Sequence, residues 1–250
     1  WIDYGKALNV MVADGSFFAT LDAHLKRWQV GEGDTWHWDV LTAQGGSSDF
    51  SLNHPTTHGA DLRTRIEILK HFEQKGIYMT SEGLQEGLSE HCDFSYVAQA
   101  DPLFKSQFAA GEVVPLIPVL FQGTTYYSPG WGSTAWTLLH GAKAQWESVA
   151  PADREVWLST YFGSVVFWAQ IADRTVSNLI KTPKGWDVYY TEGGRLLVDL
   201  TNETPGEGIL LELEGKRYTP DNPPPSVSGI KARRVKGKYV PTYPPDWTGP

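Results

Sequence analysis

Two acidic residues that lie at the ends of short apolar segments are the candidates for chemistry in this chain. Asp39 lies in the run Trp36–Leu41, and Glu82 follows the run Ile77–Thr80. A helix-like stretch joins the two runs, which predicts a strand-helix-strand unit with an acid at each strand end. In a (β/α) barrel the carboxyl ends of the strands form the catalytic face, so acids from neighbouring strands point into one pocket. Two facing acids are the minimal equipment for hydrolysing a glycosidic bond.

The strand period predicts which neighbours share the inner wall with these acids. If Asp39 faces the barrel axis, His37 and Leu41 share its side, while Trp36 and Trp38 pack outward under helices. The same phase turns three polar side chains of the second strand inward: Tyr78, Thr80 and Glu82. A wall this polar is unusual for a barrel core and indicates a functional role.

A structural role for the acids is the alternative. Asp39 or Glu82 can cap a loop or pair with Arg63 or Arg65. Glu86 and Glu90 are weaker rivals for the catalytic role, because they lie in a polar, Gly-containing segment with no strand before it.

Candidate substrate contacts lie in the loops. The long loop after the first strand carries Asp49 and His54, and His54 can equally belong to an ordered His-Pro turn. Flat aromatic faces suit sugar rings, which makes Tyr126, Trp131 and Trp136 candidate platforms, with core packing as the alternative. Together with His37 and Tyr78, these residues form the predicted substrate-binding set.

The remaining pattern predicts an α/β protein, a partial (β/α) TIM-type barrel followed by a small antiparallel β domain. The expected domains are 1–183 for the barrel region, 184–222 for the β-rich part and 223–250 for a Pro-rich extended tail. Helical spacing predicts helices over Ser16–Gln29, Asp61–Lys75, Ser133–Val149 and Ala152–Lys181. Further strands are expected over Phe94–Ala98, Val113–Phe121, Trp186–Tyr190, Arg195–Leu200 and Ile209–Leu213.

Composition narrows the function classes. The 250 residues carry a net charge of −8, which argues against a nucleic-acid partner. No apolar run is long enough to span a membrane, and the first residues lack the order of a secretory signal, so the compartment stays open between secreted and cytoplasmic.

Cys92 is the only cysteine; His91 and Asp93 flank it without a third ligand at suitable spacing, so we expect no metal site. No nucleotide-binding or Ser-hydrolase motif follows a strand, and we expect no cofactor.

Several short motifs resemble those of a known enzyme group. They are Trp38-Asp39-Val40-Leu41-Thr42-Ala43, Asp49-Phe50, His54-Pro55-Thr56, a helix with Arg65, Thr80-Ser81-Glu82-Gly83 and Val114-Pro115-Leu116. Their succession resembles the catalytic barrel of the α-N-acetylgalactosaminidases of glycoside hydrolase families 129 and 101, over roughly residues 36–122. The resemblance implies a retaining glycosidase acting on an α-linked N-acetylgalactosaminide or related galactoside. It also implies that Asp39 is the nucleophile and Glu82 the acid/base.

The sequence contains only about four barrel-like strands, whereas a closed barrel has eight, and this leaves two other hypotheses open. The chain is a non-catalytic carbohydrate-binding protein, or it is a subunit or section of a larger barrel enzyme. In the second case a partner chain or a missing N-terminal region completes the barrel. The best internal candidate for a strand beside Trp36–Leu41 is Leu8–Val12, which is short and apolar.

Overall fold

The chain divides into two compact units, residues 1–97 and 98–250. The computed structural model describes the following residues: 15–43, 46, 48, 50, 52, 55–96, 114–128, 134–143, 161–201, 208–225, 231–235 and 238–242. The predicted strand over Leu8–Val12 lies outside them.

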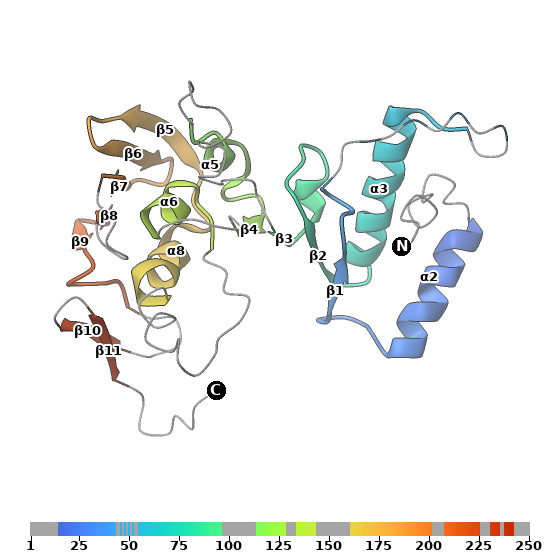
Figure 1. The fold of residues 1–250 in the computed structure, drawn as a ribbon. Coiled ribbons are helices and arrows are strands. Elements are labelled where there is room, and N and C mark those ends of the chain that lie inside the picture. The colour runs from blue at the N-terminus through green and yellow to red at the C-terminus, as the bar shows by residue number, and fades with distance from the viewer. Residues whose placement is uncertain are drawn as a thin grey trace, which may run out of the picture. The chain divides into compact units, whose positions relative to one another are not determined.

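The N-terminal unit contains a parallel sheet in which β1, β2 and β3 are neighbours in that order (Figure 1). Helix α3 connects β1 to β2, which confirms the predicted strand-helix-strand unit. A crossover between parallel strands needs such a helix because the chain must return to the edge where the first strand began. The elements are α2 Gly15–Trp28, β1 Thr35–Trp38, α3 His58–Glu73, β2 Tyr78–Glu82, the 3₁₀ turn η2 Ser89–His91 and β3 Phe94–Tyr96.

Helix α3, His58–Glu73, begins three residues before and ends two residues before the predicted range Asp61–Lys75. The side chain of Thr57 accepts a hydrogen bond from the backbone N–H of Ala60 and caps the N-terminus. Asp61 lies in the first turn and Lys70 in the last, where each charge opposes the helix dipole. Apolar residues of α2, α3, β1 and β2 form one core: Leu21, Leu25, Leu41, Ile68, Leu69, Phe72, Ile77, Met79 and Leu88, with Trp36 and Trp38 packed against them.

Strand β1 is shorter than predicted and ends at Trp38. Val40 has a φ of 61°, a left-handed conformation in which the strand cannot continue. The alternation of side chains therefore stops, and Leu41 turns into the core, where it is fully buried. The expectation that Leu41 shares the inner wall with His37 is wrong for this reason.

Gly83 follows β2 at a point where two backbone segments come close together. A Cβ atom on Gly83 would lie 2.6 Å from the Cα atom of Ala43, and Gly83 has a φ of 73°. Both facts require glycine here, because other residues disfavour this φ and bring a side chain into the contact. The absence of a side chain thus lets the turn after β1 approach the end of β2.

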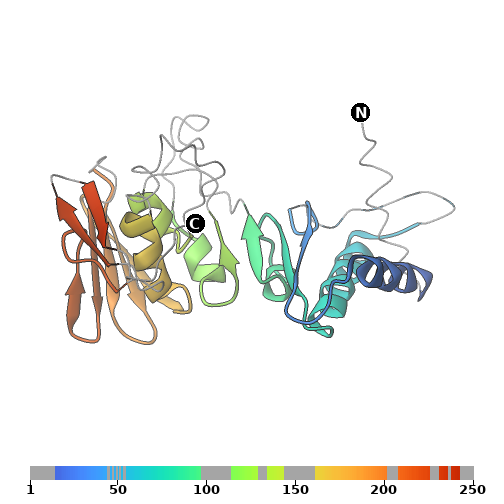
Figure 2. The same ribbon diagram turned by 90° about the horizontal axis from the view of Figure 1, so that it is seen from below.

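The C-terminal unit contains an antiparallel sheet with the order β5-β6-β7-β8-β9. Helices α6 and α8 pack against this sheet (Figure 2), and their apolar residues share one core with it. The elements are α5 Ile117–Phe121, β4 Tyr126–Tyr127, α6 Thr134–Leu139, the π-helical turn η4 Tyr161–Val165, α8 Val166–Ile171, β5 Val176–Lys181, β6 Gly185–Tyr190, β7 Arg195–Asp199, β8 Ile209–Leu213, β9 Lys216–Tyr218, β10 Lys231–Val235 and β11 Lys238–Thr242.

Three predictions in this unit are wrong. The run Val113–Phe121 ends in helix α5 and not in a strand, because Pro118 fits the first turn of a helix and cannot donate to a sheet. The predicted helix Ala152–Lys181 ends before β5, which pairs with β6 instead. Within 223–250, β10 and β11 form an antiparallel hairpin where an extended tail was expected.

The fold is therefore mixed α/β, with a parallel sheet in the first unit and an antiparallel sheet in the second. The antiparallel sheet begins at Val176, before the predicted domain boundary at 183, and the helices that precede it share its core. In the part of the chain that the structure describes, no helix has the length and apolar character needed to cross a membrane.

The core of the first unit predicts the effect of a cavity mutation. Phe72 is fully buried and its ring contacts Trp36 and Trp38, so Phe72→Ala should lower the free energy of unfolding by about 3 to 5 kcal/mol. Urea denaturation followed by tryptophan fluorescence measures this. Phe50→Ala is the control, because Phe50 is 90% exposed and its loss should leave the midpoint unchanged. Equal midpoints for both variants would contradict the packing described.

The close approach at Gly83 predicts a second stability difference. Gly83→Ala should destabilise the fold by more than the ~1 to 2 kcal/mol that a left-handed conformation costs an L-residue, because the new Cβ also meets backbone. Gly87→Ala is the matched control: Gly87 has a φ of 80°, and a Cβ atom added there would meet nothing within 4 Å. Thermal unfolding of the two variants should therefore separate steric contact from backbone strain, and equal losses would exclude the contact.

Candidate functional site

The pairing of β1 with β2 brings Asp39 and Glu82 together. Trp38 is the register partner of Ser81, so the next residues along the two parallel strands are Asp39 and Glu82. Asp39 lies just beyond the carboxyl end of β1, and Glu82 is the last residue of β2. Asp39 is exposed and Glu82 is half-buried, so both carboxyl groups lie at the surface of the same sheet edge.

The two carboxyl groups interact with each other. Desolvation by burial raises the pKa of Glu82, and a side-chain hydrogen-bonding interaction with Asp39 and the negative charge of Asp39 raise it further. The charge of His37 opposes these effects and lowers the pKa of Glu82. The net effect is a pKa above the ordinary 4.5 of glutamate, so Glu82 keeps its proton to a higher pH than a free glutamate does.

One face of the sheet carries polar and aromatic side chains beside this acid pair. Nδ1 of His37 lies 2.9 Å from Oγ1 of Thr80, its register partner on β2. The His37 ring meets the ring of Tyr96 edge to face, with 5.4 Å between ring centroids. Tyr78 lies two residues before Thr80 on the same strand and is 54% exposed. The face therefore offers hydrogen-bonding groups and aromatic surface to a ligand.

Tyr96 is a residue that the sequence reasoning missed. It lies on β3 as the register partner of Glu82, and its contact with His37 spans the sheet from β3 to β1. The sequence could have indicated Tyr96 through the alternation of Phe94-Ser95-Tyr96. If this run is a third parallel strand in phase with β2, Tyr96 lies on the same face as Glu82.

The alternative interpretation, in which Asp39 or Glu82 pairs with an arginine of α3, does not hold for Arg65. Nε of Arg65 lies 3.1 Å from both carboxylate oxygens of Asp61, one helical turn earlier. Nη1 of Arg65 donates to the carbonyl oxygen of Leu41 at 2.7 Å. Arg65 therefore binds the backbone of the turn that follows Asp39.

Two of the other predicted substrate contacts belong to the C-terminal unit, and three lie outside the described residues. Tyr126 belongs to the C-terminal unit, is 42% exposed and donates a hydrogen bond to Asp173 at 2.5 Å. Trp136 is only 6% exposed and lies in the core of that unit, so an exposed platform at Trp136 is the wrong interpretation. The physical reason is that every residue of α6 is buried. Asp49, His54 and Trp131 lie outside the described residues.

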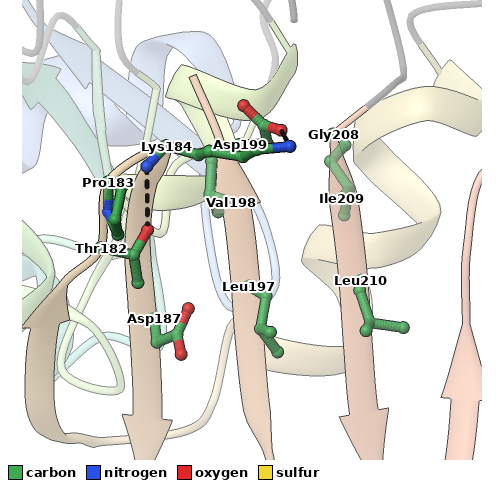
Figure 3. Close-up of a pocket in the computed structure, with 10 residues that line it drawn as sticks. All are labelled: Thr182, Pro183, Lys184, Asp187, Leu197, Val198, Asp199, Gly208, Ile209 and Leu210. Carbon is green, nitrogen blue, oxygen red and sulfur yellow. Dashed lines mark hydrogen bonds and ion pairs between the residues drawn. The ribbon is translucent and has the colours of Figure 1, made fainter. Parts of the chain in front are cut away.

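A cavity of about 620 Å³ lies on the antiparallel sheet of the C-terminal unit (Figure 3). Leu197 and Leu210 are among its apolar lining residues, and Nζ of Lys184 lies 3.6 Å from a carboxylate oxygen of Asp199. Hydrogen bonds from Thr201 and the charge of Lys184 lower the pKa of Asp199, which stays ionised. An ionised, ion-paired aspartate is a poor proton donor, so the acid pair at Asp39 and Glu82 is the better candidate for catalysis.

The described residues contain no group of three His, Cys, Asp or Glu side chains that could hold a metal ion. His91 lies near Glu73 and Glu90, with nitrogen-to-oxygen distances of 3.5 and 3.7 Å. Asp93 accepts a hydrogen bond from the backbone N–H of Met79. These contacts indicate structural roles for His91 and Asp93, the two residues that flank Cys92.

Comparisons with known proteins give matches at the level of structure. No protein-family model and no curated protein matches the sequence. Solved structures of the α-N-acetylgalactosaminidase NagBb from Bifidobacterium bifidum do match. A quadruple mutant gives a TM-score of 0.62 at 13% identity over 81% of this chain. The ligand-free enzyme gives 0.61 at 14% over 82%, and the GalNAc complex gives 0.60 at 14% over 81%.

The match is to a segment of that enzyme, because it covers 34% to 35% of the length of the solved chains. At this identity the likeness concerns the fold. It agrees with the motif resemblance of residues 36–122, which contain the acid pair. The chain thus resembles, in motifs and in fold, a part of the α-N-acetylgalactosaminidases.

Proposed function

We propose that this chain is the catalytic part of a retaining glycoside hydrolase that cleaves an α-linked N-acetylgalactosaminide or a related galactoside. The interaction of Asp39 with Glu82 at one sheet edge is the observation that carries the proposal. In this proposal β1, β2 and β3 are strands of a (β/α) barrel whose carboxyl ends face the substrate.

The proximity of the two acids supports the retaining alternative. Inverting enzymes hold their carboxyl groups roughly 6.5 to 9.5 Å apart to leave room for a water molecule, whereas retaining enzymes hold them about 5 to 5.5 Å apart. Asp39 and Glu82 directly follow register partners on neighbouring parallel strands, whose backbones lie about 4.8 Å apart, and this spacing suits the shorter separation.

The proposed reaction has two steps. In the first, a carboxylate oxygen of Asp39 attacks the anomeric carbon, the glycosidic C–O bond breaks, and the leaving oxygen takes the proton of Glu82. In the second, the Glu82 carboxylate removes a proton from water, whose oxygen attacks the anomeric carbon and releases Asp39. Glu82 is then protonated again and the product has the configuration of the substrate.

The environment of each acid fits its proposed role. Glu82 is half-buried and its pKa is raised, so it holds its proton to a higher pH than an ordinary glutamate, as the acid role requires. Asp39 is exposed at the strand end, where a substrate can reach it. His37, Tyr78 and Tyr96 lie on the same face and are proposed to contact the sugar. The GalNAc specificity is proposed from the fold match, since a GalNAc complex of NagBb is among the similar structures.

Substitution of the two acids should give different phenotypes. Glu82→Gln should keep glycosylation of an aryl α-GalNAc substrate with a good leaving group, lose activity on natural glycosides, and regain turnover with azide. Asp39→Asn should abolish turnover of both substrates, because the nucleophile is lost. Steady-state kinetics with the two substrate types, with and without azide, measure the difference.

Glu86→Gln is the matched control, because Glu86 is an exposed glutamate four residues after Glu82 and should leave kcat/KM unchanged. Equal loss in Glu82→Gln and Asp39→Asn on aryl substrates, without azide rescue, would contradict the assigned roles. Binding of GalNAc by the wild-type chain without turnover of any glycoside would favour a non-catalytic carbohydrate-binding protein.

The raised pKa of Glu82 predicts the alkaline limb of the pH profile. Glycosylation needs Glu82 protonated, so kcat/KM on a natural glycoside should fall as the pH rises through a pKa above the ordinary 4.5 of glutamate. With an activated aryl substrate, whose leaving group needs no proton from Glu82, the wild-type protein should not show this limb. An alkaline limb that is the same on both substrates would assign the titration to another group.

A further inference from the structure

A buried serine closes the turn that carries the proposed nucleophile. Oγ of Ser81 donates to the carbonyl oxygen of Trp38 at 2.7 Å, just before Asp39. The same Oγ accepts from the backbone N–H of Thr42 at 3.1 Å, after the turn. One hydroxyl group therefore holds both ends of residues 38–42, and Ser81 is the neighbour of Glu82 in sequence.

Two further side chains tie the same turn to its surroundings. The Thr42 hydroxyl lies 2.7 Å from the carbonyl oxygen of Glu82 and 3.0 Å from that of Gly83, and donates toward both. The Arg65 guanidinium holds the Leu41 carbonyl at 2.7 Å while it pairs with Asp61. Thr42, Ser81 and Arg65 are each at most 2% exposed.

The backbone within this turn is strained. Val40 follows Asp39 directly and has a φ of 61°, although β-branched residues rarely adopt the left-handed region. Such a conformation persists where neighbouring contacts over-determine it, and such residues cluster at active sites. The contacts on Trp38, Leu41 and Thr42 provide that constraint on both sides of Asp39 and Val40.

We propose that Thr42, Ser81 and Arg65 form a positioning clamp that fixes the carboxyl group of Asp39 against that of Glu82. The catalytic meaning of the clamp rests on the function proposed above. The three residues are buried beneath the sheet edge and bind backbone atoms, so they act through the turn and are not catalytic residues themselves. Hydrogen bonds to the backbone on both sides of Asp39 and to Glu82 itself set the distance between the two carboxyl groups.

Thr42→Val tests the clamp, because valine has the shape of threonine without the hydroxyl. We expect kcat to fall by about 10- to 100-fold with little change in KM, since a misplacement near 1 Å can cost 10²-fold. The pKa of Glu82, followed by NMR of its labelled carboxyl carbon, should shift down as Asp39 moves away. Thr42→Ser keeps the hydroxyl and should restore both values.

Thr64→Val is the matched control, because the Thr64 hydroxyl donates to the carbonyl of Ala60 within helix α3 at 3.1 Å. It should leave kcat and the pKa of Glu82 unchanged. Ser81→Ala is the second variant if Thr42→Val does not fold, and it should shift the Glu82 pKa in the same direction. Circular dichroism establishes that each variant is folded before its titration is read.

The pKa of Glu82 and the kcat for hydrolysis together distinguish a failure of the clamp from a failure of the proposed function. In one outcome the pKa of Glu82 shifts in Thr42→Val or Ser81→Ala and returns in Thr42→Ser, but neither the wild-type protein nor any variant hydrolyses a glycoside. This outcome would uphold the positioning contacts and reject the hydrolase. A folded Thr42→Val or Ser81→Ala protein with the wild-type Glu82 pKa and wild-type kcat would overturn the clamp and leave the hydrolase standing.

Discussion

The parallel register between β1 and β2 is the constraint on which the candidate site depends. It aligns Trp38 with Ser81, and the next residue of each chain segment is an acid. Alternation along β2 then sends Ser81 toward the core and Glu82 toward the open face. A shift of one residue would exchange these faces and place a carboxyl group in the core. The buried hydroxyl of Ser81, bonded to both ends of the turn after β1, is specific to the observed register.

The site brings together groups that oppose folding. Two carboxyl groups repel each other when both are ionised, and the charge of Asp39 contributes to the raised pKa of Glu82. Val40 keeps a strained φ, and Asp61 and Arg65 form a buried ion pair whose desolvation is costly. Val40 and Arg65 both concern the turn after β1, because Val40 lies within it and Arg65 donates to the carbonyl oxygen of Leu41.

The C-terminal unit has its own hydrophobic core between helices and the antiparallel sheet. Its cavity is bordered by an ionised, ion-paired aspartate, so its chemistry differs from that of the acid pair. The chain spans about a third of the length of the solved enzymes to which its fold is similar. The fold likeness covers about 80% of the chain, so it extends beyond the motif region into parts where the sequence motifs gave no indication.

Local sequence determined the elements with regular apolar spacing and clear ends. Helices α2 and α3, strands β1 to β3 and strands β6 to β8 follow from side-chain period, caps and glycine stops, because these signals act within a few residues. The polar face of His37, Thr80 and Glu82 follows from the same period. The family resemblance rests on short motifs around Asp39 and Glu82, so the sequence alone carried it.

Tertiary structure decided what depends on contacts distant in sequence. Leu41 is core because Val40 reverses the chain, Trp136 is core because the whole of α6 is enclosed, and β5 is a strand because β6 pairs with it. The role of Arg65 required its distance to Leu41, 24 positions earlier. The raised pKa of Glu82 depends on desolvation and on a neighbour from another strand. A single sequence carries the residue types for these effects, while burial and pairing arise only when the strands are brought into register.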